Sequence, residues 1–189
     1  INGNQIDRVF TINNIPNLLE IKNMTITDGK YDNPGANGYG GAGLYIYDSV
    51  VYLDNVKITN NETDDDGGGI ACNNCVLSIY NSIIDNNLTT QTSSGGGIMA
   101  GDNSNLTLSY VVISDNQTAN YGGGLAIWDT DLYIENTTIV KNSTSSENIN
   151  HGGGIYNGSG IGLIKNSIIW FNSPAEELPW EYDKKIRSV

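Results

Sequence analysis

A glycine run closed by an aliphatic residue returns five times along the chain, and this repeat constrains the fold more than any other feature. The run reads GGAGL at residues 40–44, and GGGI or GGGL at residues 67–70, 95–98, 122–125 and 152–155. The closing residues are 26, 28, 27 and 30 positions apart: Leu44, Ile70, Ile98, Leu125 and Ile155. Repeats of roughly 20–50 residues are typical of solenoids, in which each repeat stacks on its neighbours.

A second element accompanies the glycine runs and has its own aligned columns. Its six copies read LEIKNMTITDG, VYLDNVKITNN, LSIYNSIIDNN, LTLSYVVISDN, LYIENTTIVKN and GLIKNSIIWFN. One column holds only isoleucine: Ile26, Ile58, Ile84, Ile113, Ile139 and Ile169. Three residues earlier stand Asn23, Asn55, Asn81, Tyr110, Asn136 and Asn166, and three residues later stand Gly29, Asn61, Asn87, Asn116, Asn142 and Asn172. We interpret the two polar columns as stacked Asn ladders, one at each corner of a coil.

The short segments between these columns have the alternation of strands with one buried face, as in Leu77-Ser-Ile79. They are separated by Asn or Gly, which tolerate left-handed backbone at a corner. No two-residue hairpin signal is repeated, so a meander of antiparallel strands is disfavoured. The pattern therefore predicts an all-β chain in which parallel coils stack in register, with about six coils and three short strands in each.

The domain organisation follows from the repeat. Residues 1–173 are predicted to form the six coils, the first from residues 8–12 and 19–26. Residues 174–189 are predicted to be an excursion or cap that leads towards a further coil, because residues 186–189 resemble the start of another strand. We expect the chain to be a fragment of a longer surface protein, or to associate end to end, since an uncovered end would expose unpaired backbone.

The combination of GGGI or GGAGL with IxxN, and the opening IDRVFTI…LEIKNMTITDG, resembles the repeats of polymorphic outer-membrane proteins and of adhesin-like surface proteins of methanogenic archaea. The resemblance covers residues 6–173. It implies a right-handed, single-stranded parallel β-helix, a pectin-lyase-like solenoid. It also implies a secreted or cell-surface location, and it names no ligand.

The charge of the chain restricts its partners. Twenty-one acidic residues against 9 basic ones give a net charge of −12. Nucleic acid is excluded as a partner on this ground, and no apolar run is long enough for membrane insertion. Carbohydrate or another surface protein is the expected partner, and no cofactor is required, calcium being the one candidate.

The stretch DDDGGGIACNNC at residues 64–75 is the densest in chemistry-bearing side chains. Asp64, Asp65 and Asp66 lie in a variable corner and have two interpretations, a solvated acidic loop or a Ca²⁺ site. Cys72 and Cys75 are close enough in sequence for a disulfide across a turn, with free thiols and a metal site as alternatives. The glycines are interpreted as structural, because the lack of a Cβ lets coils approach one another.

Eight Asn-x-Ser/Thr sequons occur, and most are by-products of an Asn column next to Thr-rich strands. In a glycosylating host, the corner positions Asn61, Asn87, Asn116 and Asn142 are expected to be accessible.

An enzyme is the main alternative to a binding role, because many β-helices cleave polysaccharides. If the residues closing the glycine runs point inward, the outward row is Tyr45, Ala71, Met99, Ala126 and Tyr156, which holds no acid or base. A lyase needs a base and a hydrolase needs two carboxylates. Asp102, Asp129 and Asp131 fall at the next corner, where Asp is a common turn residue. We therefore expect no catalytic residues, with a pectinase-like lyase or hydrolase as the alternative.

A binding role is favoured by aromatic side chains expected on the decorated side of the coils. They are Tyr39, Tyr45, Tyr121, Trp128 and Tyr156. Such rings can stack on sugars. The sequence thus favours a non-catalytic extracellular adhesin or stalk segment that binds glycans, with a structural subunit of an extracellular filament as a further alternative.

Overall fold

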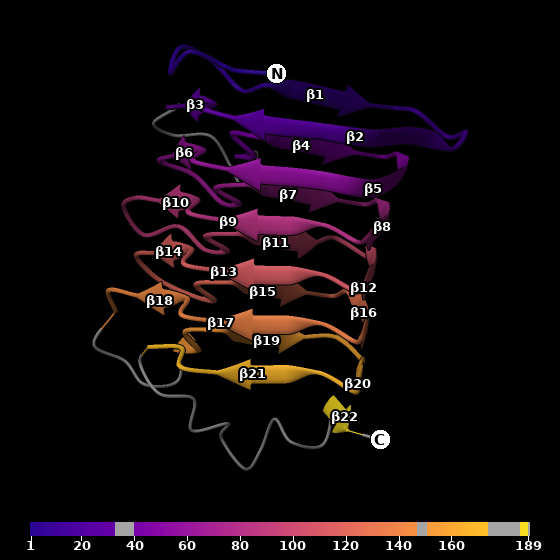
Figure 1. Cartoon of the computed structure of the whole chain (residues 1–189), viewed down its shortest axis with the longest axis vertical. Coiled ribbons are helices and arrows are strands. Elements are labelled where there is room, and N and C mark those ends of the chain that lie inside the picture. The colour runs from indigo at the N-terminus through magenta and orange to yellow at the C-terminus, as the bar shows by residue number, and fades with distance from the viewer. Residues whose placement is uncertain (33–39, 147–150, 174–185, 189) are drawn as a thin grey trace.

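The computed structural model describes residues 1–32, 40–146, 151–173 and 186–188, and in these residues the chain winds repeatedly around one axis (Figure 1). Strands of successive coils pair in parallel and, within the described ranges, form sheets of six, five and eleven strands. The fold is a parallel β-helix. The predicted all-β class and the stacking of coils are confirmed.

Three sheets line the stack, and the first two each take one strand from successive coils. The first sheet follows the glycine runs and contains β1 (Phe10–Asn13), β4 (Leu44–Tyr47), β7 (Ile70–Asn73), β11 (Ile98–Gly101), β15 (Leu125–Trp128) and β19 (Ile155–Ser159). The short sheet contains β3 (Lys30–Tyr31), β6 (Glu62–Thr63), β10 (Leu88–Thr89), β14 (Gln117–Thr118) and β18 (Ser143–Thr144).

The third sheet turns a corner, and we call it the bent sheet. Its strands before the corner are β8 (Val76–Tyr80), β12 (Asn105–Ser109), β16 (Asp131–Glu135), β20 (Gly162–Lys165) and β22 (Ile186–Ser188). After the corner come β9 (Ile83–Asp85), β13 (Val112–Ser114), β17 (Thr138–Val140) and β21 (Ile168–Trp170). In the first two coils, β2 (Leu19–Thr27) and β5 (Val50–Thr59) run through the corner as single strands.

The core consists of aliphatic columns that stack in register along the axis. Ile26 pairs with Ile58 and Ile58 with Ile84, and all three are fully buried. Leu44 pairs with Ile70 in the same way on the first sheet. The predicted isoleucine column is therefore confirmed, and because each coil covers the next, apolar surface is buried along the whole stack.

Two strand predictions need correction or extension. The coils that begin at β7, β11 and β15 have four strands each, while the first two coils have three because β2 and β5 run through the corner. The segment that was not predicted is the two-residue strand of the short sheet, since two residues are too few to show alternation. The strand expected near the C-terminus is present, since Ile186 of β22 pairs with Gly162 of β20. The excursion or cap predicted before it, residues 174–185, lies outside the described residues.

The inner corner holds a continuous ladder of buried Asn side chains. The Nδ2 of Asn61 donates to Oδ1 of Asn87 at 2.9 Å, and Asn87 donates likewise to Asn116 at 2.9 Å. The ladder continues from Asn116 to Asn142 at 2.9 Å and from Asn142 to Asn172 at 3.1 Å. From Asn61 to Asn172, each coil is thereby joined to the next by a hydrogen bond between side-chain amides inside the core, as predicted.

The outer corner differs from its prediction, because it is not a continuous ladder. Asn55 donates to Asn23 at 2.9 Å, but Asn81 donates to Asp54 at 2.9 Å. These amides are exposed to water, which competes for their hydrogen bonds. The six residues of this column share a left-handed backbone conformation, with φ between 48° and 57°. Asn suits the outer corner mainly because it tolerates the left-handed region.

Tyr110 is the exception in this column, with φ of 57° and 62 % of its surface exposed. A left-handed conformation costs about 1–2 kcal/mol for most residues and less for Asn. We therefore expect Tyr110→Asn to raise the free energy of unfolding by about 1 kcal/mol, or Tm by about 2–4 °C for a chain of this size. Thermal unfolding followed by circular dichroism measures it. The reciprocal Asn81→Tyr should lower Tm, and equal Tm values for all three proteins would contradict the explanation.

The glycine runs are structural, as predicted. The glycine three residues before each closing aliphatic residue has positive φ, for example 69° at Gly95. The third glycine lies against the next coil, so that a Cβ on Gly97 would be 2.6 Å from the carbonyl oxygen of Gly124. Such a distance is well inside van der Waals contact, so glycine is required for the spacing between coils.

A row of hydroxyl groups also connects the coils, directly after the outer corner. Ser82 Oγ donates to the carbonyl of Tyr80 at 2.6 Å and accepts from the backbone N–H of Val56 at 3.0 Å. Thr137 repeats the pattern, donating to Glu135 at 3.0 Å and accepting from Val111 at 3.4 Å. The sequence carries a signal for this row, because Ser82, Thr137 and Ser167 directly follow the outer column.

Candidate functional site

The outward row of the first sheet lies where the sequence predicts it. Tyr45, Ala71, Met99, Ala126 and Tyr156 occupy one register position of successive strands. The row is nevertheless largely covered, because Tyr45 is 9 % exposed and Ala71 and Ala126 are fully buried. Side chains beside the row, rather than the row alone, therefore form the surface on this side.

Three of the five predicted aromatic residues come together with a histidine, and we call these four residues the aromatic cluster: Tyr121, Trp128, His151 and Tyr156. The ring of Tyr121 lies 4.1 Å from that of His151 and 4.3 Å from that of Tyr156. The ring of Trp128 lies 5.4 Å from Tyr156 and 5.9 Å from Tyr121. All four side chains are half-buried, so their rings are fixed by packing and still reach solvent.

His151 was not predicted as a member of this cluster, although its position in the repeat contains the signal. It precedes Gly152 as Tyr121 precedes Gly122, and the N–H of Gly122 donates to the carbonyl of His151 at 2.8 Å. Burial lowers the pKa of His151 from its ordinary value. The imidazole is therefore neutral at neutral pH and packs as an aromatic ring.

A local irregularity of β19 adapts the backbone to the cluster. The pairing of β15 with β19 shifts register after Ile127, which pairs with Asn157, while Trp128 pairs with Ser159. Gly158 lies in the bulge, and a Cβ there would be 2.5 Å from Nε1 of Trp128. The bulge and its glycine make room for the indole ring.

The other predicted binding residues lie elsewhere. Tyr45 contacts the guanidinium of Arg8, whose Cζ is 4.8 Å from the Tyr45 ring and 3.6 Å from the ring of Tyr31. Tyr45 belongs to the second strand of the first sheet and Tyr156 to the sixth, so the two are four coils apart. Tyr39 lies outside the described residues. The five predicted aromatics therefore do not form one site.

The three adjacent aspartates do not converge. Asp64 accepts from Gln91 at 3.1 Å, Asp65 accepts from the backbone N–H of Asp66 at 2.8 Å, and Asp66 accepts from the N–H of Ser94 at 2.6 Å. In the described part of the chain, no group of three or more His, Cys, Asp or Glu side chains is placed to hold a metal ion. The interpretation of Asp64, Asp65 and Asp66 as a shared Ca²⁺ site is not supported by this geometry.

Asp66 has an altered acidity. Burial, assisted by the charge of Asp65, raises its pKa to about 6, although the hydrogen bond from Ser94 acts in the opposite direction. The folded protein thus binds a proton more tightly than the unfolded chain, whose Asp pKa is about 3.9. Stability should fall as pH rises from about 4 to 6, by on the order of 2 kcal/mol after allowing for partial solvent exposure.

Urea unfolding between pH 4 and 7.5 tests this dependence on Asp66. Asp66→Asn keeps an acceptor for Ser94 and should remove most of the decline between pH 4 and 6. Asp102→Asn, at an exposed left-handed turn position, changes the net charge equally and should leave the decline in place. An unchanged pH profile in Asp66→Asn would refute the assignment.

Cys72 and Cys75 form a disulfide, with Cα atoms 5.9 Å apart. Cys72 is fully buried and Cys75 is 3 % exposed, and both belong to the hydrophobic core. Of the alternatives from the sequence, the structure has the disulfide. Its position inside the coil indicates a structural role.

The expected accessibility of the corner sequons is wrong. Asn61, Asn87, Asn116 and Asn142 are at most 1 % exposed, because they form the inner ladder. A glycan on any of them would displace a buried Asn side chain and break its hydrogen bonds to the neighbouring coils. Among the remaining sequons, Asn23 and Asn105 are exposed.

The aspartates considered for catalysis occupy turn positions. Asp102 and Asp129 have φ of 56° and 44°, and both are exposed. Asp131 begins β16 and is also exposed. These positions agree with the turn role expected of Asp.

The comparisons with known proteins concern the fold. A family model described as a right-handed beta helix region matches residues 9–174. No curated protein and no solved structure matches the chain. The described ranges contain no helix long and apolar enough to cross a membrane.

Proposed function

Because the chain belongs to the right-handed beta helix family, we propose that it is a non-catalytic extracellular segment, an adhesin or stalk module, that binds glycans through the aromatic cluster. The observation that carries this proposal is the arrangement of Tyr121, Trp128 and Tyr156 with ring centroids 4.3–5.9 Å apart and half-buried. Aromatic rings held in this way offer flat apolar faces, and sugar rings present C–H groups that pack on them.

The resemblance to polymorphic outer-membrane proteins and archaeal adhesin-like proteins supports the cell-surface location. The net charge of −12 supports an uncharged partner over an acidic one.

The catalytic alternative has less support. A hydrolase requires two carboxylates at a defined separation, and the outward row of the first sheet carries none. Asp66 is a half-buried carboxyl with a raised pKa, but it stands in one column with His151 and three coils away from it. With strands of adjacent coils about 4.8 Å apart, that separation is too large for joint action on one bond.

A glycan array with the purified protein tests the proposal, followed by product analysis on each retained glycan. Retention without cleavage is expected. Trp128→Ala should weaken it about tenfold through the loss of one stacking face. Tyr133→Ala is the matched control, because Tyr133 is also half-buried but lies on the bent sheet. Cleaved products would favour the lyase or hydrolase.

The same array also tests the calcium site and the spacer or filament alternative. Repeating the array with calcium and then with a chelator tests whether Asp64–Asp66 recruit an ion in the presence of ligand. No retention on any glycan would reject the binding proposal and favour a spacer or filament subunit.

A further inference from the structure

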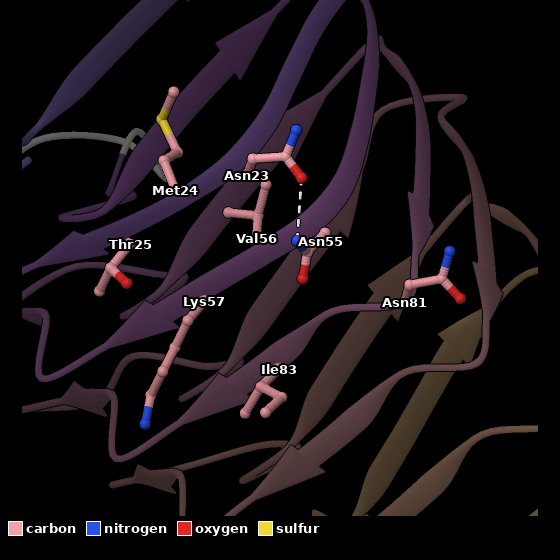
Figure 2. A pocket seen from close by; sticks show the side chains of 8 residues that line it. All are labelled: Asn23, Met24, Thr25, Asn55, Val56, Lys57, Asn81 and Ile83. Carbon is pink, nitrogen blue, oxygen red and sulfur yellow. Dashed lines mark hydrogen bonds between the residues drawn. The ribbon is translucent and has the colours of Figure 1, made fainter.

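A depression lies on the outer surface of the bent sheet, at its corner, away from the aromatic cluster (Figure 2). It has a volume of about 360 Å³ and spans the first three coils. The residues that line it are Asn23, Met24, Thr25, Asn55, Val56, Lys57, Asn81 and Ile83.

One side of this corner groove is a row of amides. Asn23, Asn55 and Asn81 are exposed and stand one coil apart, as Figure 2 shows. The bond from Asn55 to Asn23 uses one donor of the first and one lone pair of the second. A primary amide has two donors and two lone pairs, so each side chain keeps hydrogen-bonding capacity for a ligand.

The charges in the groove are compensated within the protein. Lys57 is the only charged residue that lines it, and its Nζ lies 3.0 Å from Oδ2 of Asp85. Asp54, next to Asn55, accepts from Asn81. A hydroxyl-rich, uncharged ligand suits such a surface, whereas a polyanion would meet the net charge of −12.

Apolar side chains continue the surface along the stack. Ile83 is 41 % exposed and Val112, its register partner in the next coil, is 38 % exposed. Tyr110, which replaces Asn in the amide row, is 62 % exposed despite its left-handed backbone. Asn would adopt this backbone conformation more easily than Tyr110 does. Stability therefore does not explain why an exposed aromatic ring stands at this position.

We propose that this corner groove, extended by Tyr110, is a second carbohydrate site that binds a neutral, linear glycan lying along the stack axis. The amide row hydrogen-bonds the hydroxyl groups of the glycan, while Ile83, Val112 and Tyr110 pack on its C–H faces. The inference rests on the proposed glycan-binding function and adds a separate site and a ligand class.

Affinity gel electrophoresis of the full chain tests the second site, with hydroxyethyl cellulose as the neutral β-linked glucan and polygalacturonate as the acidic polymer. The wild-type protein should be retarded by the neutral glucan alone. Tyr110→Asn, which the fold should tolerate, is expected to weaken retardation about fivefold or more. Asn55→Gly removes an amide while keeping the left-handed backbone, and should act in the same direction.

Asn166→Gly is the matched control, since Asn166 occupies the same column with φ of 48° but lies outside the groove. It should leave retardation unchanged. If Tyr110→Asn and Asn55→Gly bind like the wild type while Trp128→Ala does not, the second site is refuted and the proposed function stands. Retardation by polygalacturonate alone would refute the ligand class. Absence of binding to any glycan would refute both proposals.

Discussion

Replacing Asn116 by alanine should lower the free energy of unfolding by about 4 kcal/mol, one of the two largest effects expected in this protein. Asn116 is fully buried, and its Nδ2 donates to the Ile84 carbonyl at 2.9 Å and to Asn142 at 2.9 Å. Its Oδ1 accepts from the backbone N–H and the Nδ2 of Asn87 at 3.0 and 2.9 Å. Alanine removes all four hydrogen bonds. Asn142 Oδ1 keeps the backbone N–H of residue 116, and Asn87 Nδ2 keeps the Ile58 carbonyl. The backbone N–H of Asn87 and the bond to the Ile84 carbonyl lose the side chain altogether, and each buried group left unsatisfied costs about 1–3 kcal/mol.

Urea unfolding measures the effect of Asn116→Ala, with the midpoint expected to fall at an unchanged slope. Asn105→Ala is the control in the same coil, because Asn105 is exposed in β12 and should change stability by less than about 0.5 kcal/mol. A loss below about 1 kcal/mol in Asn116→Ala would show that the inner ladder is not a main source of stability.

Replacing Gly97 by alanine should be at least as damaging, through the spacing of the coils. The new Cβ would lie 2.6 Å from the carbonyl oxygen of Gly124 and 3.0 Å from Nδ2 of Asn116. Both neighbours are fixed, one by backbone pairing and the other by the inner ladder. The coils must separate locally, and we expect a loss of about 4 kcal/mol or more, or a fall in Tm on the order of 10 °C.

Differential scanning calorimetry of Gly97→Ala and Gly101→Ala separates this steric effect from the general cost of losing a glycine. Gly101 ends β11, the strand that begins directly after Gly97, and the nearest atoms to its added Cβ are 3.3 Å away. Gly101→Ala should therefore be nearly neutral. Similar Tm values for the two variants would mean that coil spacing adjusts easily.

Most of the fold could be predicted because the repeat places each residue type in a column. The spacing of Ile58 and Ile84 alone predicts that they are neighbours in adjacent coils, and the structure pairs them. The two Asn columns, in contrast, could not be told apart by sequence. One is inside and forms a ladder through Asn87, and the other is outside and is kept for its backbone conformation.

The same ambiguity explains the error over the sequons, since the expectation that a corner Asn is exposed holds for Asn23 in the outer column and fails for Asn61 in the inner one. Whether a corner Asn points inward depends on the path of the chain around the coil. That path is set by the two-residue strands, such as β10, which carry no periodic signal.

The candidate site was only partly predictable. Tyr121, Trp128 and Tyr156 lie in two adjacent coils, so a repeat alignment brings them together. The side chains of neighbouring coils cover the outward row and pack against His151 to an extent that depends on their size. The spacing of the repeat does not predict this. The corner groove could not be predicted for another reason: its amides belong to a column in which the left-handed backbone already accounts for Asn.

The strand pairing and the Asn hydrogen bonds between adjacent coils also determine how this molecule would respond to tension. Because each coil contacts mainly its neighbours, pulling on the two ends of the chain should detach coils one after another from the ends of the stack. A repeat of 26 to 30 residues would release roughly 90 Å of extended chain each time. A protein built in this way would lengthen in steps under tension, absorbing work at each step while the remaining coils stay folded.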